Sequence, residues 1–162
     1  MTASGPRAEV LPVENTWVRA GRIHIDAPRQ ALFDLVADPR RHSDFDGSGT
    51  VQGAVHGPER LYLGAKFGMK MKIGLPYRID NTVVEFQDGY RIAWRHIGRH
   101  RWRYEFADAP DGGTFVTETF DGSTAIFPPA LKLMNAYENN QKAVLKTLAR
   151  MKVLAESGGV GS

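Results

Sequence analysis

Two polar side chains, His96 and Glu118, fall within a tract of aromatic residues that runs from Tyr90 to Phe120. Imidazole and carboxyl groups are common proton-transfer groups in general acid–base catalysis, and the phenol of Tyr104 could join them. A buried carboxylate without a partner is costly, so an inward Glu118 must be hydrogen-bonded, neutral or facing a cavity that holds water. The tract therefore favours a pocket over a dry core, with His96, Glu118 and Tyr104 as candidate catalytic residues.

Aromatic and charged residues alternate in this tract, which is the period-2 pattern of antiparallel strands with one apolar face. If residues 98–100 form a three-residue hairpin loop, Trp94 lies opposite Tyr104 and the aromatic side chains share one face. The other pairs in this register would be His96 with Trp102 and Ile92 with Phe106. A two-residue loop would pair Trp94 with Arg103 and mix charge into the apolar side, so the pattern favours the longer loop.

The hairpin that follows extends the same face. Pairing Phe106 with Val116 places Glu118 beside Tyr104. The inward wall, which we expect to bind a ligand, then consists of Trp94, His96, Trp102, Tyr104, Glu118 and Phe120. Structural explanations of the pattern stay open: Tyr104 or His96 could satisfy Glu118 without a ligand, and a shifted strand would expose Glu118. A single inward histidine is also more often a satisfied core residue than a catalyst.

Two further segments could complete the lining of a pocket. Phe67, Met69 and Met71 alternate with lysines, which gives a soft apolar face suited to an adaptable pocket or to ordinary packing. Met134 and Tyr137 lie on the last predicted helix and could form a lid, although such residues at helical spacing are usually plain packing. We include Phe67, Met69, Met134 and Tyr137 among the predicted ligand-binding residues.

The opposite face of the same strands is strongly charged. It carries Arg91, Arg95, Arg101 and Arg103, with Glu85 and Glu105 nearby. Guanidinium groups on adjacent strands could hold an anionic partner or lipid headgroups. We favour a solvated face with cross-strand ion pairs, each of which contributes little to stability.

Other polar clusters give no recognisable cofactor or metal site. His42, Asp44 and Asp46 are close in the sequence but lack the spacing of converging metal ligands, so we interpret them as a polar loop. The segment Gly47-Ser48-Gly49 lacks the lysine and the serine or threonine of a phosphate-binding loop. We therefore predict neither a metal nor a cofactor.

The composition is typical of a single globular domain. The chain has 162 residues, of which 42% are hydrophobic and 24% charged, and it has no cysteine, which excludes disulfides and thiolate metal sites. The net charge of +3 does not demand a nucleic-acid partner, and we expect none. No apolar run approaches the length that crosses a bilayer, and the first residues lack a signal-peptide pattern, so we predict a cytoplasmic location.

Hydrophobic periodicity and the positions of glycine and proline divide the chain into strands and helices. The predicted strands are residues 16–26, 50–56, 59–72, 77–87, 89–97, 101–108 and 114–122. The predicted helices are two short ones, at residues 28–38 and 40–45, and a long one at residues 128–156. Residues 15–156 form the predicted domain, and we expect residues 1–14 and 157–162 to be flexible.

The order of these elements resembles the START/Bet v 1-like superfamily, specifically its bacterial polyketide cyclase/dehydrase and lipid-transport group. The segments that carry the resemblance are residues 23–28, 33–39, 81–94 and 145–156. It implies an α+β helix-grip fold, in which a seven-stranded curved antiparallel sheet and a long carboxy-terminal helix enclose a hydrophobic cavity. It also implies a ligand entrance at Gly74-Leu75-Pro76, with residues 125–129 opposite. These patterns indicate a fold and do not specify a reaction.

The leading functional hypothesis is a binding module, monomeric or homodimeric, that encloses a hydrophobic or aromatic small molecule such as a lipid, an isoprenoid or a polyketide-like compound. The second is an enzyme resembling the aromatase/cyclases, in which His96, Glu118 or Tyr104 moves protons during aldol closure or dehydration. The third is a protein-interaction module that uses the arginine-rich face.

Overall fold

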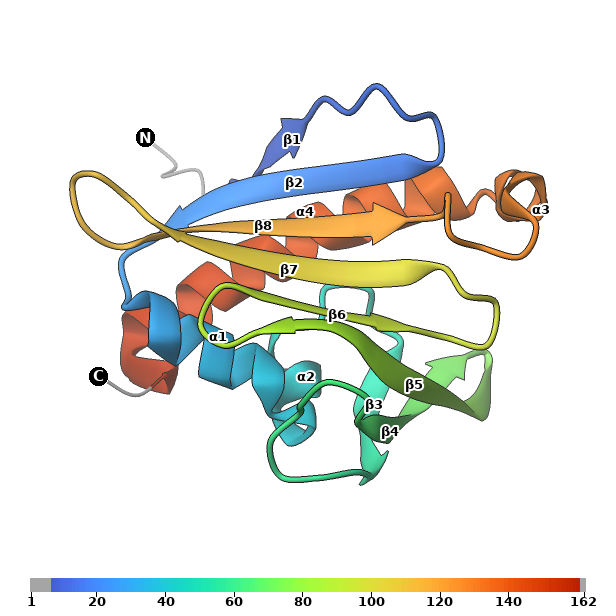
Figure 1. Ribbon diagram of the computed structural model, residues 1–162, viewed down its shortest axis with the longest axis horizontal. Helices are drawn as coiled ribbons and strands as arrows, with labels where there is room; N and C mark the ends of the chain where they lie inside the picture. The colour runs from blue at the N-terminus through green and yellow to red at the C-terminus, as the bar shows by residue number, and fades with distance from the viewer. Residues whose placement is uncertain (1–6, 161–162) are drawn as a thin grey trace.

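An eight-stranded antiparallel sheet forms the framework of the fold (Figure 1). The computed structural model describes residues 7–160, and the flexibility expected for residues 1–6 and 161–162 lies outside them. The strands are β1 (Glu9–Leu11), β2 (Val18–Ile25), β3 (Val51–His56), β4 (Lys66–Ile73), β5 (Leu75–Gln87), β6 (Arg91–Arg95), β7 (Arg101–Asp108) and β8 (Thr114–Asp121). The helices are α1 (Arg29–Ala37), η1 (Pro39–Arg41), α2 (His42–Phe45), α3 (Pro128–Leu133), α4 (Ala136–Leu154) and the π-helical turn η2 (Ala155–Gly159).

The sequence prediction of seven strands is wrong by one, because it misses β1. The strand order is β1-β2-β8-β7-β6-β5-β4-β3, and β1 pairs with β2 at the edge of the sheet, with Glu9 opposite Arg22. β1 lies within the segment for which we expected flexibility. Its three residues are too few to show an alternating pattern, so only the pairing with β2 defines them as a strand.

The predicted register is right for one hairpin and shifted for the other. In β7 and β8, Tyr104 lies opposite Glu118 and Trp102 opposite Phe120, as predicted. In β6 and β7, Trp94 lies opposite Trp102 rather than Tyr104. The loop is longer than the predicted three residues, because β6 ends at Arg95 and β7 begins at Arg101. A shift of two positions leaves every side chain on its predicted face, so the inward wall is kept.

The helices differ from the prediction mainly near the carboxyl end. The single helix expected at residues 128–156 is two helices, α3 and α4, because Asn135 adopts a left-handed conformation with φ 55° between them. α1 ends at Ala37, one residue before the predicted end at residue 38, because Pro39 disfavours helix in the residue before it. No helix within residues 7–160 is long and apolar enough to cross a membrane.

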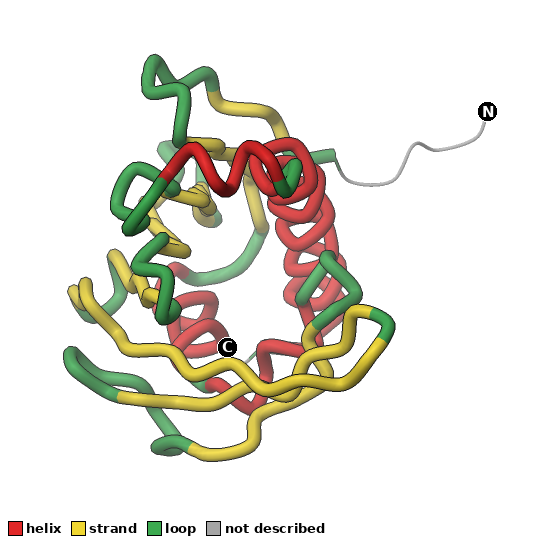
Figure 2. The backbone as a smooth tube through the Cα atoms, turned by 90° about the vertical axis from the view of Figure 1, so that its right-hand side faces the viewer, coloured by secondary structure: helices red, strands yellow, loops and turns green. Residues whose placement is uncertain are grey.

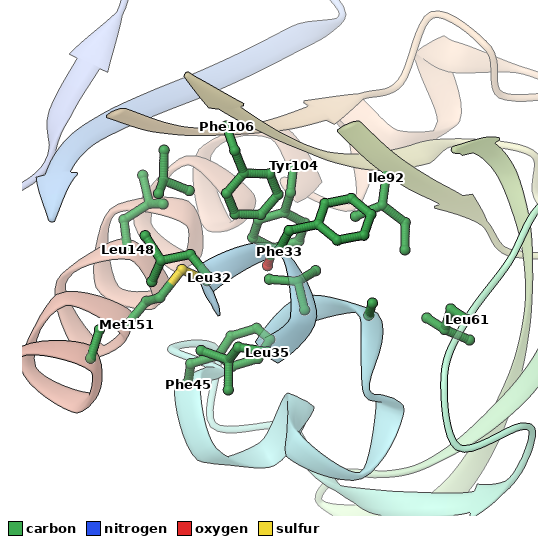
Figure 3. Packing of buried hydrophobic residues seen from close by; sticks show 14 of the residues in the cluster. Leu32, Phe33, Leu35, Phe45, Leu61, Ile92, Tyr104, Phe106, Leu148 and Met151 are labelled. Atoms are coloured by element: carbon green, nitrogen blue, oxygen red, sulfur yellow. The ribbon is translucent and has the colours of Figure 1, made fainter. Parts of the chain in front are cut away.

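The solid part of the core lies at one end of the molecule, between the sheet, α1 and α4. In Figure 2 the strands curve, with α4 along one side. Figure 3 shows the packing of buried side chains from α1, β7 and α4: Leu32 and Phe33, Tyr104 and Phe106, and Leu148 and Met151. This packing anchors the carboxyl half of α4. Side chains from the amino half of α4, including Ala136, Asn139 and Ala143, line a cavity.

Gly47 is the point at which the loop after α2 touches the backbone of α4. Its N–H donates a hydrogen bond of 2.9 Å to Thr147 Oγ1. A Cβ at this position would come within 2.6 Å of the main-chain carbonyl carbon of Lys146, which real structures do not tolerate. The absence of a side chain here therefore fixes how closely α4 approaches α2.

We predict that Gly47→Ala lowers the free energy of unfolding by about 1–3 kcal/mol, because the helix must move to admit the methyl group. Urea unfolding followed by circular dichroism measures the change. Gly98→Ala is the control, since a Cβ there meets only the His100 side chain, at 3.2 Å. Equal stability of the two variants would contradict this account of the α2–α4 contact.

Candidate ligand-binding cavity

A mostly apolar cavity of about 720 Å³ lies between the inner face of the sheet and helices α3 and α4. Nine of the ten predicted ligand-binding residues lie in its lining: Phe67, Met69, Trp94, His96, Trp102, Tyr104, Glu118, Phe120 and Met134. The sheet supplies most of this set because alternate residues of β4, β6, β7 and β8 point to the concave side. The structure thus gathers these residues around one space, and their binding role stays a prediction.

Tyr137 is the exception, because it packs against Phe120 outside the lining. Its ring centroid lies 5.7 Å from that of Phe120 and 5.5 Å from that of Trp17, and its hydroxyl donates to the Pro128 carbonyl at 3.0 Å. The break at Asn135 rotates α4 relative to the unbroken helix assumed from the sequence. Periodicity counted across that break therefore misplaces Tyr137.

His42 is a lining residue that the sequence interpretation as a polar loop misses. Its ring is buried and stacks on Trp94, with ring centroids 4.9 Å apart and an interplanar angle of 19°. Nε2 lies 2.7 Å from the Val36 carbonyl oxygen and donates to it. Burial lowers the pKa of His42 to about 4, so the ring is neutral near pH 7. Phe45, one helical turn later, is the sequence signal that this side of α2 faces inward.

Glu118 and Tyr104 form a buried hydrogen-bonded pair at the inner wall. The Tyr104 hydroxyl donates to Glu118 Oε1 at 2.8 Å, and the two residues are only 4% and 3% exposed. Burial, which outweighs the Tyr104 hydrogen bond, raises the pKa of Glu118 well above its ordinary value, and the charge of Asp46 raises it further. The neutral acid is therefore favoured, and because Oε1 accepts from Tyr104, the acid proton belongs on Oε2. The structural explanation considered from the sequence, a tyrosine that satisfies Glu118, accounts for only one of its two oxygens.

Three buried polar atoms in the lining have no hydrogen-bond partner from the protein: Asn81 Oδ1, His96 Nδ1 and Glu118 Oε2. Burial lowers the pKa of His96 to about 3, with a smaller contribution from His100, whose ring centroid lies 4.8 Å away. The imidazole is therefore neutral. Among the described residues a fourth such atom, Arg101 Nε, lies on a side chain of the opposite face. The lining is thus an apolar surface with separate donors and acceptors that the fold leaves unused.

The outer face of the sheet carries the cross-strand ion pairs that the sequence favoured. Glu85 accepts hydrogen bonds from Arg103 at 2.8 Å and from Arg101 at 3.2 Å, and Arg91 lies 3.9 Å away. Arg91 also pairs with Glu105 at 3.7 Å. Arg91, Arg101 and Arg103 thus each have a carboxylate partner on the same sheet.

Several of the exposed lining residues lie at the end of the cavity formed by the β4–β5 turn and α3, which we call the mouth. Ile73 and Tyr77 flank the turn between β4 and β5, and Met134 lies at the end of α3; all are exposed. The entrance expected at Gly74-Leu75-Pro76 is therefore adjacent to this mouth. Residues 125–129 are not among the lining residues, and their place opposite the entrance stays a prediction.

The cluster of His42, Asp44 and Asp46 does not converge on a single point. The Asp46 carboxylate instead accepts hydrogen bonds from the loop that follows it, from Ser48 Oγ at 2.8 Å and Gly49 N–H at 3.1 Å. Within the part of the chain that the structure describes, no three histidine or acidic side chains come together as metal ligands do.

The chain belongs to the family described as polyketide cyclase / dehydrase and lipid transport, whose model matches residues 17–156. It is 43% identical over 121 residues to Rv0088, an uncharacterised protein of Mycobacterium tuberculosis strain H37Rv. The match to MT0096, from strain CDC 1551 of the same species, is 42% identical over 121 residues. In both cases it covers 72% of this chain and 54% of the relative, so the chain spans about half the length of the curated relatives it matches.

Solved structures share the fold at low sequence identity. Ms6760 from Mycobacterium smegmatis superposes with a TM-score of 0.69 at 17% identity, over 94% of this chain and 99% of that one. An AHSA1-like protein from Aeromonas hydrophila gives 0.61 at 19% identity, over 88% and 94%. The di-domain aromatase/cyclase StfQ of the steffimycin biosynthetic pathway gives 0.60 at 14% identity, over 88% of this chain and 51% of StfQ. These likenesses establish the helix-grip architecture alone.

The buried, neutral His42 should make the fold sensitive to acid. Its pKa is about 4 in the folded protein against 6.5 in the unfolded chain, so between these pH values the unfolded state takes up a proton that the folded state does not. This stabilising contribution is complete above pH 6.5 and is lost as the pH falls toward 4, by roughly 3 kcal/mol in all.

We predict that His42→Phe is less stable than the parent at pH 7, by about 1–2 kcal/mol, because the Val36 carbonyl loses its donor. Its stability should fall less steeply between pH 6.5 and 4. Urea midpoints at a series of pH values measure both effects, with His24→Phe, at an exposed histidine, as the control. Parallel pH profiles for His42→Phe and the parent protein would disprove this role of His42.

Proposed function

We propose that this domain binds a hydrophobic or aromatic small molecule that carries oxygen or nitrogen functions, in the cavity between the sheet and α4. The observation that carries the proposal is the coincidence of an apolar cavity of about 720 Å³ with three unpartnered polar atoms in its lining. Lipid, isoprenoid and polyketide-like compounds all have this character. A cytoplasmic location and a monomeric or homodimeric state stay predictions from the sequence.

The volume and the polar atoms support the same type of ligand. Ligand pockets commonly measure about 300–1,000 Å³ and combine an apolar wall with a few fixed polar groups. A buried polar atom without a partner costs about 1–3 kcal/mol, so a ligand that supplies the missing partners recovers that energy on binding. The protonated Glu118 Oε2 can donate a hydrogen bond to a ligand, whereas Asn81 Oδ1 can accept one. A carbonyl at the first position and a hydroxyl or amine at the second would match them.

The aromatic wall favours a ligand with flat or ring-shaped parts. Trp94, Trp102 and Phe120 present rings to the cavity, and Phe67 stands at 84° to Trp94 with centroids 5.5 Å apart. Aromatic faces and edges bind other rings in stacked and edge-on arrangements. Met69 and Met71 add side chains that adapt to irregular shapes.

A second candidate function is catalysis of an intramolecular aldol closure, favoured by the presence of a carboxylic acid and an imidazole, each with an unpartnered polar atom, in the lining of one cavity. His96 would take a proton from a carbon next to a carbonyl, the resulting enolate would form a carbon–carbon bond to a second carbonyl, and Glu118 would protonate the new alkoxide. Tyr104 would hold Glu118 in place. The interaction-module hypothesis is weaker, since Arg101 and Arg103 already pair with Glu85 and Arg91 already pairs with Glu105.

A fluorescent anilinonaphthalene probe tests the binding proposal. It should bind at one site and quench tryptophan fluorescence, because Trp94 and Trp102 line the cavity. Ala143→Phe places a ring into the lining and should lower the affinity for the probe by about tenfold or more, because the ring takes up cavity volume that the probe needs. Val153→Phe is the matched control on the same helix, at a position 55% exposed. Equal affinities for the two variants, or binding at many weak sites, would count against a cavity ligand.

Turnover of a poly-β-ketone thioester tests the catalytic candidate. His96→Ala and Glu118→Gln should each slow product formation by about 100-fold or more if these groups move protons. Circular dichroism must show an intact fold. Tyr104→Phe should have a smaller effect, and Tyr137→Phe, outside the lining, should have none. Probe binding with no turnover, or turnover that both substitutions leave unchanged, would remove the catalytic candidate and leave the binding proposal standing.

A further inference from the structure

Large apolar side chains are exposed around the mouth of the cavity. We define the mouth surface as Ile73, Leu75, Ile97, Phe127, Leu133 and Met134. The most exposed are Ile97 at 94%, Leu133 at 90% and Leu75 at 80%. Single exposed apolar residues are normal, but a contiguous group around a cavity points to an interaction site.

These residues come from separate segments that the fold brings to one end of the molecule. Figure 1 shows the β4–β5 hairpin, the β6–β7 loop and α3 at the same, right-hand end, and Figure 2 looks onto that end. Hydrogen bonds join two of the segments: Ile126 N–H donates to the Gly98 carbonyl at 3.0 Å, and Thr124 Oγ1 donates to the Arg99 carbonyl at 2.7 Å. Ile73 and Met134 both line the cavity itself. The mouth surface therefore borders the opening.

The charges beside the mouth surface are basic. Lys72, Arg99, Lys132 and Lys142 are exposed on the same segments and on the first turns of α4. The carboxylates nearby have partners of their own. Asp121 lies 3.8 Å from Arg103, Asp80 lies 4.0 Å from Arg78, and Glu138 lies 3.6 Å from Arg19. The mouth thus combines projecting apolar tips with unopposed positive charge.

We propose that the mouth surface docks onto an anionic lipid bilayer, so that the cavity opens into the apolar part of the membrane. Apolar side chains inserted at the headgroup boundary and basic residues above it are the two contributions that hold peripheral proteins on anionic membranes. This inference rests on the proposed function in one respect, since an apolar ligand could then pass between membrane and cavity without crossing water.

The shape and charge of the mouth surface favour a bilayer over a second copy of the chain. Leu75, Ile97 and Leu133 stand on three different tips, which suits insertion into a soft interface. Two copies meeting through this end would bring like charges together, which is unfavourable at low dielectric. An anionic bilayer meets both the apolar and the basic parts of the surface.

Vesicle sedimentation tests the proposal. The full chain should sediment with vesicles of equal parts phosphatidylcholine and phosphatidylglycerol and remain in the supernatant with phosphatidylcholine alone. Ile97→Ser/Leu133→Ser should weaken binding by about tenfold or more, because two inserted side chains are lost. Val10→Ser/Val153→Ser is the matched control, with both positions 55% exposed, on β1 and near the carboxyl end of α4. Arg99→Glu/Lys132→Glu should also weaken binding, and added salt should reduce the binding of the parent protein.

Three results would overturn the proposal: no sedimentation with anionic vesicles, equal binding by the serine tip variant and its control, or a concentration-dependent dimer that the tip substitutions abolish. The last would assign the mouth surface to contacts between copies. Titration of the anilinonaphthalene probe with each variant in the absence of vesicles separates this inference from the proposed function. Loss of probe binding in every variant would count against the proposed function of the cavity. Loss of vesicle sedimentation alone would count only against membrane docking.

Discussion

The whole site depends on how α4 is held above the sheet. α4 contacts β2 and β8 along one side and α2 on the other, and Gly47 fixes its approach to α2 through Thr147. Its carboxyl half packs solidly through Leu148 and Met151. Its amino half, after the break at Asn135, leaves a space in front of the inner faces of β4, β6 and β7. This space is the cavity. A helix seated one turn deeper would fill that space with side chains.

That space gives unusual properties to the polar groups around it. In water, Glu118 would be ionised at pH 7 and His42 and His96 would titrate near it, but burial favours the neutral form of all three. Glu118 and His96 reduce the stability of the fold, because folding removes them from water without giving every polar atom a partner. Natural folds keep such groups chiefly where they serve a ligand or a reaction. In this chain Glu118, His42 and His96 all line the cavity.

Much of this arrangement could be predicted from the sequence. Alternation in β6–β8 predicted the inward wall even though the first hairpin register was wrong, because an even shift keeps each side chain on its face. The errors arise where tertiary contacts determine the local structure or the burial of a residue. β1 exists through its pairing with β2, Tyr137 is displaced by the left-handed Asn135, and His42 is buried by stacking on Trp94. Local patterns contain none of these three interactions, and the size of the cavity is likewise a property of the packed fold.

The central claim is that the space beneath α4 holds an apolar molecule that bears polar functions. Native mass spectrometry of the protein purified from its own host tests it most directly. The account predicts an added mass of one small molecule per chain, which organic extraction releases as an apolar compound containing oxygen or nitrogen. A chain that carries no such molecule after gentle purification, and that takes up none when incubated with a lipid extract of that host, would contradict it.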